Sequence, residues 1–354
     1  MKIYKNIFGL ITSPENLFLA WGMFKRDKRN KPDVMIFERN LEQNIFRLHY
    51  DLRNKTYKHG PYTGFWIRDP KLRHIHKASV RDRVLHHAIF KVLNLVFEPT
   101  LIPASYSCRI GKGSHKGMKK VAEMLREESQ NGTKRVYALK CDIKKFFDSI
   151  DHDILLGILK KKIKDPDVIW LLEEIIESFP HGQLALFSRR GVPIGNLTSQ
   201  LFANVYMNEF DQFVKHKLRV KRYARYTDDF IVISRDKEYL KNLLLPIRIF
   251  LEEELLLKLH PEKVILRRHN RGVDFLGYVS LPNHIVVRTK TKRRMLRKLR
   301  LQVVRFRKGE SSEATLLGSL RSYLGILSHG NTHQLRQELL NKFWFWLTEN
   351  KKPR

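Results

Sequence analysis

The chain has 354 residues, and 68 lysines and arginines against 36 aspartates and glutamates give it a formal net charge of +32. Its 42% of hydrophobic residues supports a packed core, and so high a positive charge repels itself unless a polyanion neutralises it, so nucleic acid is the expected partner. Two cysteines exclude a disulfide scaffold, and no apolar run approaches the ~20 residues that span a bilayer, so we expect a cytoplasmic protein with no membrane partner.

Residues 1–135 are expected to be mostly helical. Apolar residues at helical spacing, such as Ile45, Leu48 and Leu52, indicate helices within residues 14–54. The remaining expected elements of this part are a strand at 62–67 and helices at 81–97 and 119–129.

Strands and helices alternate after residue 135. The expected elements are a strand at 136–143, helices at 148–162, 173–179 and 197–216, strands at 221–226 and 230–234, a helix at 237–257 and a β-hairpin from 273. From about residue 289 the chain is helical and basic, with 11 lysines or arginines among residues 284–310. This order predicts an α+β fold followed by a basic helical segment.

Two adjacent carboxylates, Asp228 and Asp229, stand between apolar, strand-like runs, with no lysine beside them in sequence. Aspartate is common in surface turns, which is the alternative for any isolated pair, but these flanks are too apolar for an exposed turn. Asp142 lies near the end of an earlier strand, where it could instead cap a helix. If the two strands are neighbours, three carboxylates meet and would hold two Mg²⁺ ions roughly 4 Å apart for nucleotidyl transfer.

The order of these motifs resembles that of reverse transcriptases. It is carried by Asp142 with Phe146 and Phe147, by the stretch Gly-Val-Pro-Ile-Gly-Asn-Leu-Thr-Ser-Gln at 191–200, and by Tyr-Thr-Asp-Asp at 226–229. Upstream, residues 69–73 and 81–84 resemble the fingers motifs of bacterial enzymes related to group II intron proteins. Downstream, residues 260–263 and 274–278 resemble the later palm motifs and the primer grip of the family.

The resemblance implies a right-hand polymerase. An N-terminal extension and fingers are expected at 1–135, a palm with an antiparallel sheet and helices at 136–283, and a basic helical thumb at 284–354. The basic run of the last segment is interpreted as lying along a duplex backbone, with a merely solvated helix as the alternative.

The same resemblance implies roles for individual residues. Asp142, Asp228 and Asp229 would bind two Mg²⁺ ions, for which Mn²⁺ would substitute, and the Ile143 carbonyl would be a further ligand. Lys263 would give a proton to pyrophosphate, unless it is only a solvated lysine after a turn. The residues implied in binding nucleotide and template are Lys71, Arg73, Phe147, Ile194, Gly195 and Gln200, and those of the primer grip are Phe275, Leu276 and Gly277.

One departure from the common pattern distinguishes relatives. Many bacterial reverse transcriptases carry Gln-Gly-x-x-x-Ser-Pro where this chain has Ile194, Gly195, Ser199 and Gln200. This departure resembles the reverse transcriptases of diversity-generating retroelements, which are bacterial or phage-encoded and copy a template-repeat RNA into cDNA with errors at adenines (mutagenic retrohoming). An aliphatic Ile194 beside the templating pair would weaken polar enforcement of correct pairing. The alternative is that Ile194 only packs at the start of a helix and has no bearing on fidelity.

The implied partners are the template RNA, its cDNA duplex, deoxynucleoside triphosphates and a small basic accessory variability protein. Three alternatives to this interpretation exist. The first is a defence-associated or group II intron-derived reverse transcriptase of ordinary fidelity. An RNA polymerase is disfavoured because the Phe147 ring would leave no room for a ribose 2′-hydroxyl. A non-catalytic RNA-binding protein is disfavoured by the intact carboxylates.

Overall fold

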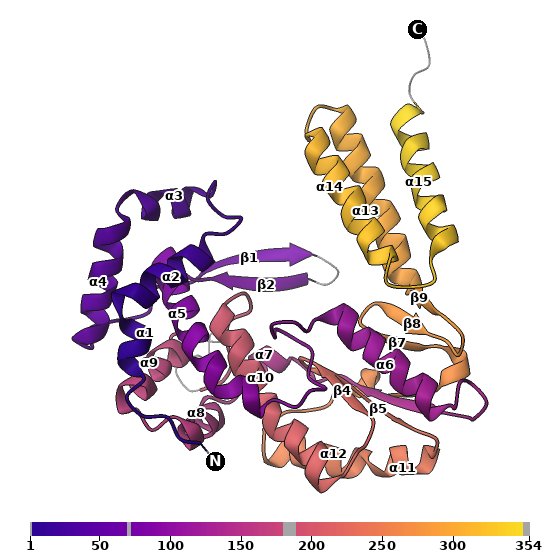
Figure 1. The fold of residues 1–354 in the computed structure, drawn as a ribbon, viewed down its shortest axis with the longest axis horizontal. Helices are drawn as coiled ribbons and strands as arrows, with labels where there is room; N and C mark the ends of the chain where they lie inside the picture. The colour runs from indigo at the N-terminus through magenta and orange to yellow at the C-terminus, as the bar shows by residue number, and fades with distance from the viewer. Residues whose placement is uncertain (1, 69–71, 180–188, 350–354) are drawn as a thin grey trace.

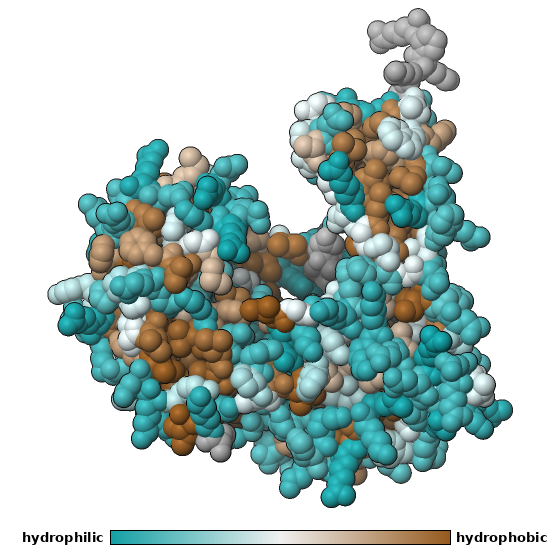
Figure 2. Space-filling model, in the orientation of Figure 1, coloured by the Kyte–Doolittle hydropathy of each residue, from teal (hydrophilic) through white to brown (hydrophobic). Residues whose placement is uncertain are grey.

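The computed structural model describes residues 2–68, 72–179 and 189–349. A helical N-terminal lobe and a C-terminal bundle of helices stand on either side of a base that contains a four-stranded sheet (Figure 1). The space-filling view shows that the surface is hollowed between these two parts (Figure 2). No helix in the described ranges is long and apolar enough to cross a membrane.

The N-terminal lobe packs helices behind a two-stranded hairpin. The predicted face of Ile45, Leu48 and Leu52 is confirmed, since all three are fully buried. The serines before α2 and α5 accept hydrogen bonds from backbone amides of the first turns, which fixes where these helices begin. The elements are α1 (Phe8–Thr12), α2 (Pro14–Phe24), α3 (Pro32–Arg39), α4 (Leu41–Arg53), β1 (Thr63–Arg68), β2 (Leu72–Lys77), α5 (Val80–Phe97) and the short η1 (Glu98–Thr100).

The sheet of the base is antiparallel throughout, in the order β4-β5-β3-β6. Its strands are β3 (Tyr137–Cys141), β4 (Tyr223–Tyr226), β5 (Asp229–Ser234) and β6 (Ile265–Arg268). Alternate side chains pack on opposite faces, as the pleat requires. Leu139 and Phe230 join the main core, whereas Ala138 and Ile231 join a second cluster that includes residues of α6.

Helices cover both faces of this sheet. Residues of α6 (Ser114–Glu128) lie in the second cluster, and residues of α10 (Leu197–Gln212), α11 (Lys237–Asn242) and α12 (Leu244–Glu253) lie in the main core. The other helices of this part are α7 (Phe146–Ser149), α8 (His152–Lys162) and α9 (Pro166–Glu177), and a π-helical turn η2 (Phe213–Lys217) follows α10.

Two helices predicted as continuous are in fact broken. The helix predicted at 148–162 is interrupted because the Asp151 side chain accepts from the amides of Asp153 and Ile154 and so starts α8 afresh. The helix predicted at 237–257 is divided into α11 and α12. Pro246 has no amide hydrogen and its ring clashes with the carbonyl four residues earlier, which is that of Asn242, the last residue of α11.

The C-terminal part joins a small sheet to three helices. Met295, Leu299 and Val303 form the buried face of α13, while most lysines and arginines of that helix lie on its other faces. The elements are η3 (Pro261–Lys263), η4 (His269–Arg271), β7 (Val273–Phe275), β8 (Tyr278–Ser280), β9 (Ile285–Val287), α13 (Thr289–Arg307), α14 (Glu313–Leu327) and α15 (His333–Thr348).

Candidate active site

Strand pairing brings the three acidic residues to one end of the sheet. Cys141 of β3 lies opposite Phe230 of β5, so Asp142 follows and Asp229 precedes the same cross-strand pair. Tyr226 pairs with Asp229, which leaves Asp228 in a tight turn of two residues between β4 and β5. Residues 86 positions apart in sequence (228 − 142) therefore lie together.

The environment of this end of the sheet disfavours negative charge. Burial raises the pKa of Asp228, and together with the neighbouring carboxylates of Asp142 and Asp229 it brings that pKa to about 6. Burial also raises the pKa of Asp229, against the opposing effect of Lys140. A bound cation would relieve both the burial penalty and the repulsion, which is why such a group of carboxylates suits a metal.

Two lysines lie against the carboxylates, although neither is adjacent to Asp228 or Asp229 in sequence. Lys263 Nζ lies 2.7 Å from Asp142 Oδ1, and Lys140 Nζ lies 3.7 Å from Asp229 Oδ1. The segment carrying Lys263 is fixed to that of Asp142, because the His260 amide donates to the Asp142 carbonyl at 2.8 Å. This backbone pairing brings Lys263 next to Asp142, although the two residues are 121 positions apart in sequence.

The Ile143 carbonyl takes no part in the hydrogen bonds that join its segment to the one carrying Lys263. Ile143 lies opposite Leu259, and the flanking bonds run from His260 N to Asp142 O and from Lys144 N to Lys258 O, both at 2.8 Å. In such a pair the central residues do not bond to each other. This carbonyl therefore does not point at Leu259.

The donor set fits Mg²⁺ rather than a metal that needs a complete protein cage. Within the described ranges, no group of three or more His, Cys, Asp or Glu side chains is placed so that it could hold a metal ion. Mg²⁺ keeps waters and substrate phosphates in its shell and needs only one or two carboxylates. The oxygens of Asp142, Asp228 and Asp229 are of the kind that it prefers.

Phe147 lies on α7, which begins four residues after Asp142. Its ring is half-buried and packs edge-on against Phe146, with the ring centres 5.4 Å apart. The Phe147 carbonyl accepts from the Val192 amide at 2.9 Å, which fixes α7 against the segment that leads to Ile194.

The hairpin β1–β2 docks on the turn that contains Ile194 and Gly195. The His76 amide donates to the Ile194 carbonyl at 3.1 Å. Gly195 has a φ of +118°, and a Cβ there would lie 2.9 Å from Ile75 Cγ2, so a side chain would push the hairpin away. Gln200 lines a cavity of about 320 Å³ beside this turn.

Arg73 and Lys71 are the other two residues expected to bind the nucleotide. Arg73 is exposed on β2 opposite Ile67, and Lys71 lies outside the described residues.

The expected primer grip forms the turn between β7 and β8. Phe275 is buried, whereas Leu276 and Gly277 occupy the turn with φ values of 52° and 89°. The Gly277 carbonyl accepts from the Arg288 amide at 3.0 Å, and the Arg288 side chain pairs with Asp274. Arg288 also acts electrostatically to lower the pKa of Asp229, so this turn lies on the side of the carboxylates.

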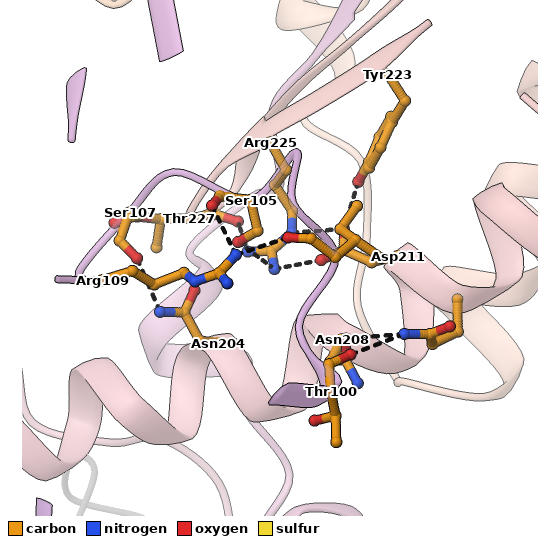
Figure 3. A network of polar contacts seen from close by, with 12 residues as sticks. Thr100, Ser105, Ser107, Arg109, Asn204, Asn208, Asp211, Tyr223, Arg225 and Thr227 are labelled. Atoms are coloured by element: carbon orange, nitrogen blue, oxygen red, sulfur yellow. Dashed lines mark hydrogen bonds and ion pairs between the residues drawn. The ribbon is translucent and has the colours of Figure 1, made fainter. Parts of the chain in front are cut away.

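A buried ion pair beneath the hairpin formed by β4 and β5 was not anticipated from the sequence. Arg225 on β4 and Asp211 on α10 are both 0% exposed, and their closest atoms lie 2.6 Å apart (Figure 3). An arginine directly before Tyr226 in an apolar strand was the available signal, because a buried charge requires a partner. Its partner comes from a different element, so the sequence alone did not identify Asp211.

Comparison with known proteins identifies the family. Residues 61–280 match the family described as reverse transcriptase (RNA-dependent DNA polymerase). The match covers more than half of the chain, and the chain therefore belongs to the reverse transcriptase family.

Its relatives include two bacterial proteins. Protein YkfC of Escherichia coli K12 is 26% identical over 59% of this chain and 63% of its own length. The group II intron-encoded protein LtrA of Lactococcus lactis subsp. cremoris is 23% identical over 67% of this chain and 49% of its own. The chain thus spans about half to two-thirds of the length of these relatives. Apo telomerase from Candida tropicalis aligns over 66% of this chain and 55% of its own, with 14% identity and a TM-score of 0.49.

Proposed function

We propose that the protein is an RNA-directed DNA polymerase that adds deoxynucleotides to a primer 3′-hydroxyl by a two-metal mechanism. The observation that carries this proposal is the meeting of Asp142, Asp228 and Asp229 at one end of β3 and β5, in a chain of this family. Residues 1–135 would be the N-terminal extension and fingers, 136–283 the palm and 284–354 the thumb. The +32 charge suits the polyanionic template and product.

Each part of the site has a proposed role in this reaction. Asp142, Asp228, Asp229 and the Ile143 carbonyl would hold two Mg²⁺ ions, or Mn²⁺ in their place. When bound, such ions activate the primer hydroxyl and stabilise the pyrophosphate leaving group. The Phe147 ring would exclude a ribose 2′-hydroxyl.

The remaining proposed contacts surround the reacting groups. Lys71 and Arg73 would bind the triphosphate, since arginine can grip phosphate through two parallel hydrogen bonds. Ile194, Gly195 and Gln200 would line the templating position. Phe275, Leu276 and Gly277 would hold the primer end.

Lys263 is predicted to contribute to the chemical step. In its contact with Asp142 it carries an ammonium proton beside the carboxylates, where the leaving pyrophosphate would accept it. We expect Lys263→Gln to lower kcat by about 10²-fold with little change in template–primer affinity, the usual scale for one acid catalyst. Single-turnover primer extension and a separate binding titration would measure the two effects.

The control for this variant is Lys258→Gln. Lys258 is exposed, and its contribution to the site is a backbone carbonyl that the substitution keeps. Equal losses of kcat in both variants would show that Lys263 acts only through general charge.

At a finer level, we propose that the enzyme copies a template-repeat RNA into adenine-mutagenised cDNA for diversity-generating retrohoming. Support comes from Ile194, whose side chain offers no hydrogen bond beside the templating position. A small basic accessory variability protein would then be its partner. The group II intron-encoded relative LtrA favours a second candidate, a defence-associated or intron-derived enzyme of ordinary fidelity.

Sequencing the products of primer extension distinguishes the two candidates. The purified protein would copy a mixed-sequence RNA with Mg²⁺ and four deoxynucleotides, with and without a co-expressed genomic neighbour. Errors concentrated opposite template adenines support the retroelement, and Ile194→Gln should then lower their frequency by up to about tenfold, the scale of one net hydrogen bond. Uniformly faithful cDNA from the wild-type chain supports the second candidate.

A further inference from the structure

We propose that Arg225 is the positioning residue of the carboxylate-bearing turn between β4 and β5, and that the Ser107 hydroxyl assists it. Both groups hydrogen-bond to Thr227, the residue directly before Asp228. This inference rests on the function proposed above, because it assigns a role within the same reaction.

The Arg225 guanidinium joins three parts of the molecule from a fully buried position (Figure 3). Its Nε and Nη2 donate to the two carboxylate oxygens of Asp211 on α10, at 2.8 and 2.6 Å. Nη2 also donates to Ser105 Oγ at 3.1 Å, and Nη1 donates to the Thr227 carbonyl at 3.0 Å. One side chain therefore ties the turn to a core helix and to the segment that precedes α6.

The main chain of Arg225 is fixed as firmly as its side chain. Its amide donates to the Ala104 carbonyl at 3.0 Å, and its carbonyl accepts from the Tyr106 amide at 2.9 Å. Because both backbone groups are bonded, the guanidinium projects from a rigid point. Because Arg225 is fixed in place, Thr227 could move only if its hydrogen bond to Arg225 were broken.

Thr227 needs such support because its backbone conformation is unfavourable. Its φ is 56°, in the left-handed region that β-branched residues rarely adopt. Strain of this kind persists only where the surroundings impose it. The turn has two residues, Thr227 and Asp228, so any relaxation of the first moves the second.

The Ser107 hydroxyl supplies the second restraint. Thr227 Oγ1 donates to Ser107 Oγ at 2.6 Å, and the Ser107 carbonyl accepts from Asn204 Nδ2 at 2.9 Å. Asn204 lies on α10, as does Asp211. The same helix therefore anchors both contacts to Thr227.

An arginine suits this role better than any other cation. Its planar guanidinium can bond a carboxylate through two parallel hydrogen bonds while other N–H groups reach further partners. A lysine in its place would keep the buried charge opposite Asp211 but could not span Asp211, Ser105 and Thr227 together. Stability alone does not require the pair, since buried ion pairs are often replaced by apolar residues at no cost.

Arg225→Lys and Ser107→Ala, with Tyr223→Phe as control, test this inference. The Tyr223 hydroxyl donates to Asp211 Oδ1 at 2.8 Å, on the side of the network away from the turn. We expect kcat of primer extension to fall about 10²-fold in Arg225→Lys and less in Ser107→Ala, because a misplacement of about 1 Å has that effect. The KM for deoxynucleotide and the template–primer affinity should change little. Ser107→Thr, which keeps the hydroxyl, should restore activity.

Replacing the Arg225–Asp211 ion pair with uncharged residues distinguishes a role in positioning the turn from a role in folding. A triple variant combines Asp211→Leu, Arg225→Met and Tyr223→Phe. It removes both buried charges, and it also removes the Tyr223 hydroxyl, which would otherwise lose its hydrogen-bond partner Asp211. We expect a folded chain with near wild-type thermal unfolding and template–primer affinity, but with the low kcat of Arg225→Lys.

Wild-type kcat in this neutral replacement, or in Arg225→Lys, would overturn the inference and leave the pair a purely structural role. A wild-type chain that makes no DNA on any RNA template would overturn the proposed function together with this inference, and would be evident before any variant is compared.

Discussion

Asp228→Asn is expected to abolish DNA synthesis while making the metal-free protein more stable at pH 7.5. The loss of synthesis follows from removing a proposed metal ligand and should exceed about 10³-fold in kcat, on the scale of several kcal/mol of transition-state charge stabilisation. The gain in stability follows from the raised pKa, since folding places an ionised carboxylate where burial and two neighbouring carboxylates disfavour it.

The sign of the pH dependence follows from the same shift. The pKa of Asp228 is about 6 in the folded chain, above its ordinary value of 3.8. Folding therefore favours the protonated form, so this group contributes stability below about pH 4 that is lost as the pH rises through 6. One pKa unit corresponds to about 1.4 kcal/mol, and the shift implies about 1–3 kcal/mol once the coupling among three carboxylates is allowed for.

Urea unfolding in a chelator would measure this effect. Asp228→Asn should be more stable than the wild-type chain by about 1–3 kcal/mol at pH 7.5, with the difference shrinking as the pH is lowered to 4. The stability difference between the same two proteins at pH 4 is therefore the control for the difference at pH 7.5. A variant that is less stable than the wild-type chain at pH 7.5 would contradict the raised pKa.

Phe147→Ala is expected to let the enzyme incorporate ribonucleotides. The ring is held by its edge-on contact with Phe146 and by the bond from the Val192 amide to its own carbonyl, so it cannot easily move aside for an additional oxygen. Removing the ring should lower the preference for deoxynucleotides by about 10²-fold, the upper range for discrimination by shape. The measurement is the ratio of kcat/KM for matched deoxynucleoside and nucleoside triphosphates.

Phe147→Tyr is the matched control for this prediction. It keeps the six-membered ring and should retain most of the preference. An unchanged ratio in Phe147→Ala would remove the proposed role of Phe147 and reopen the RNA polymerase interpretation.

Local patterns in the sequence were enough to predict the strands that carry the carboxylates. The apolar runs around Asp142 and after Asp229 lie in β3 and β5, at the centre of the sheet. Strands that are buried on both faces are apolar along their whole length, so an apolar run in the sequence is enough to predict them. The buried stripe of α4 followed from helical spacing in the same way. Helix boundaries were less accurate because they depend on single residues such as Asp151 and Pro246.

Contacts between distant parts of the chain did not follow from local patterns, and Lys263 was expected in the site only through the family resemblance. Strand β2 has no continuous apolar run and forms because β1 pairs with it. Lys263 reaches Asp142 across 121 positions, and Asp211 meets Arg225 only because α10 packs beneath β4. Such pairings are set by the whole fold, and no local window of sequence contains both partners.

The position of β3 within the sheet bears on how the chain folds during synthesis. Its neighbours β5 and β6 both come later, and β5 begins 88 residues after Cys141 (229 − 141). At ~5–20 residues per second, β3 emerges from the ribosome roughly 4 to 18 s before its first partner. An apolar strand without a partner during that interval is prone to aggregate, so we expect the yield of folded protein to depend on chaperones and on the rate of translation.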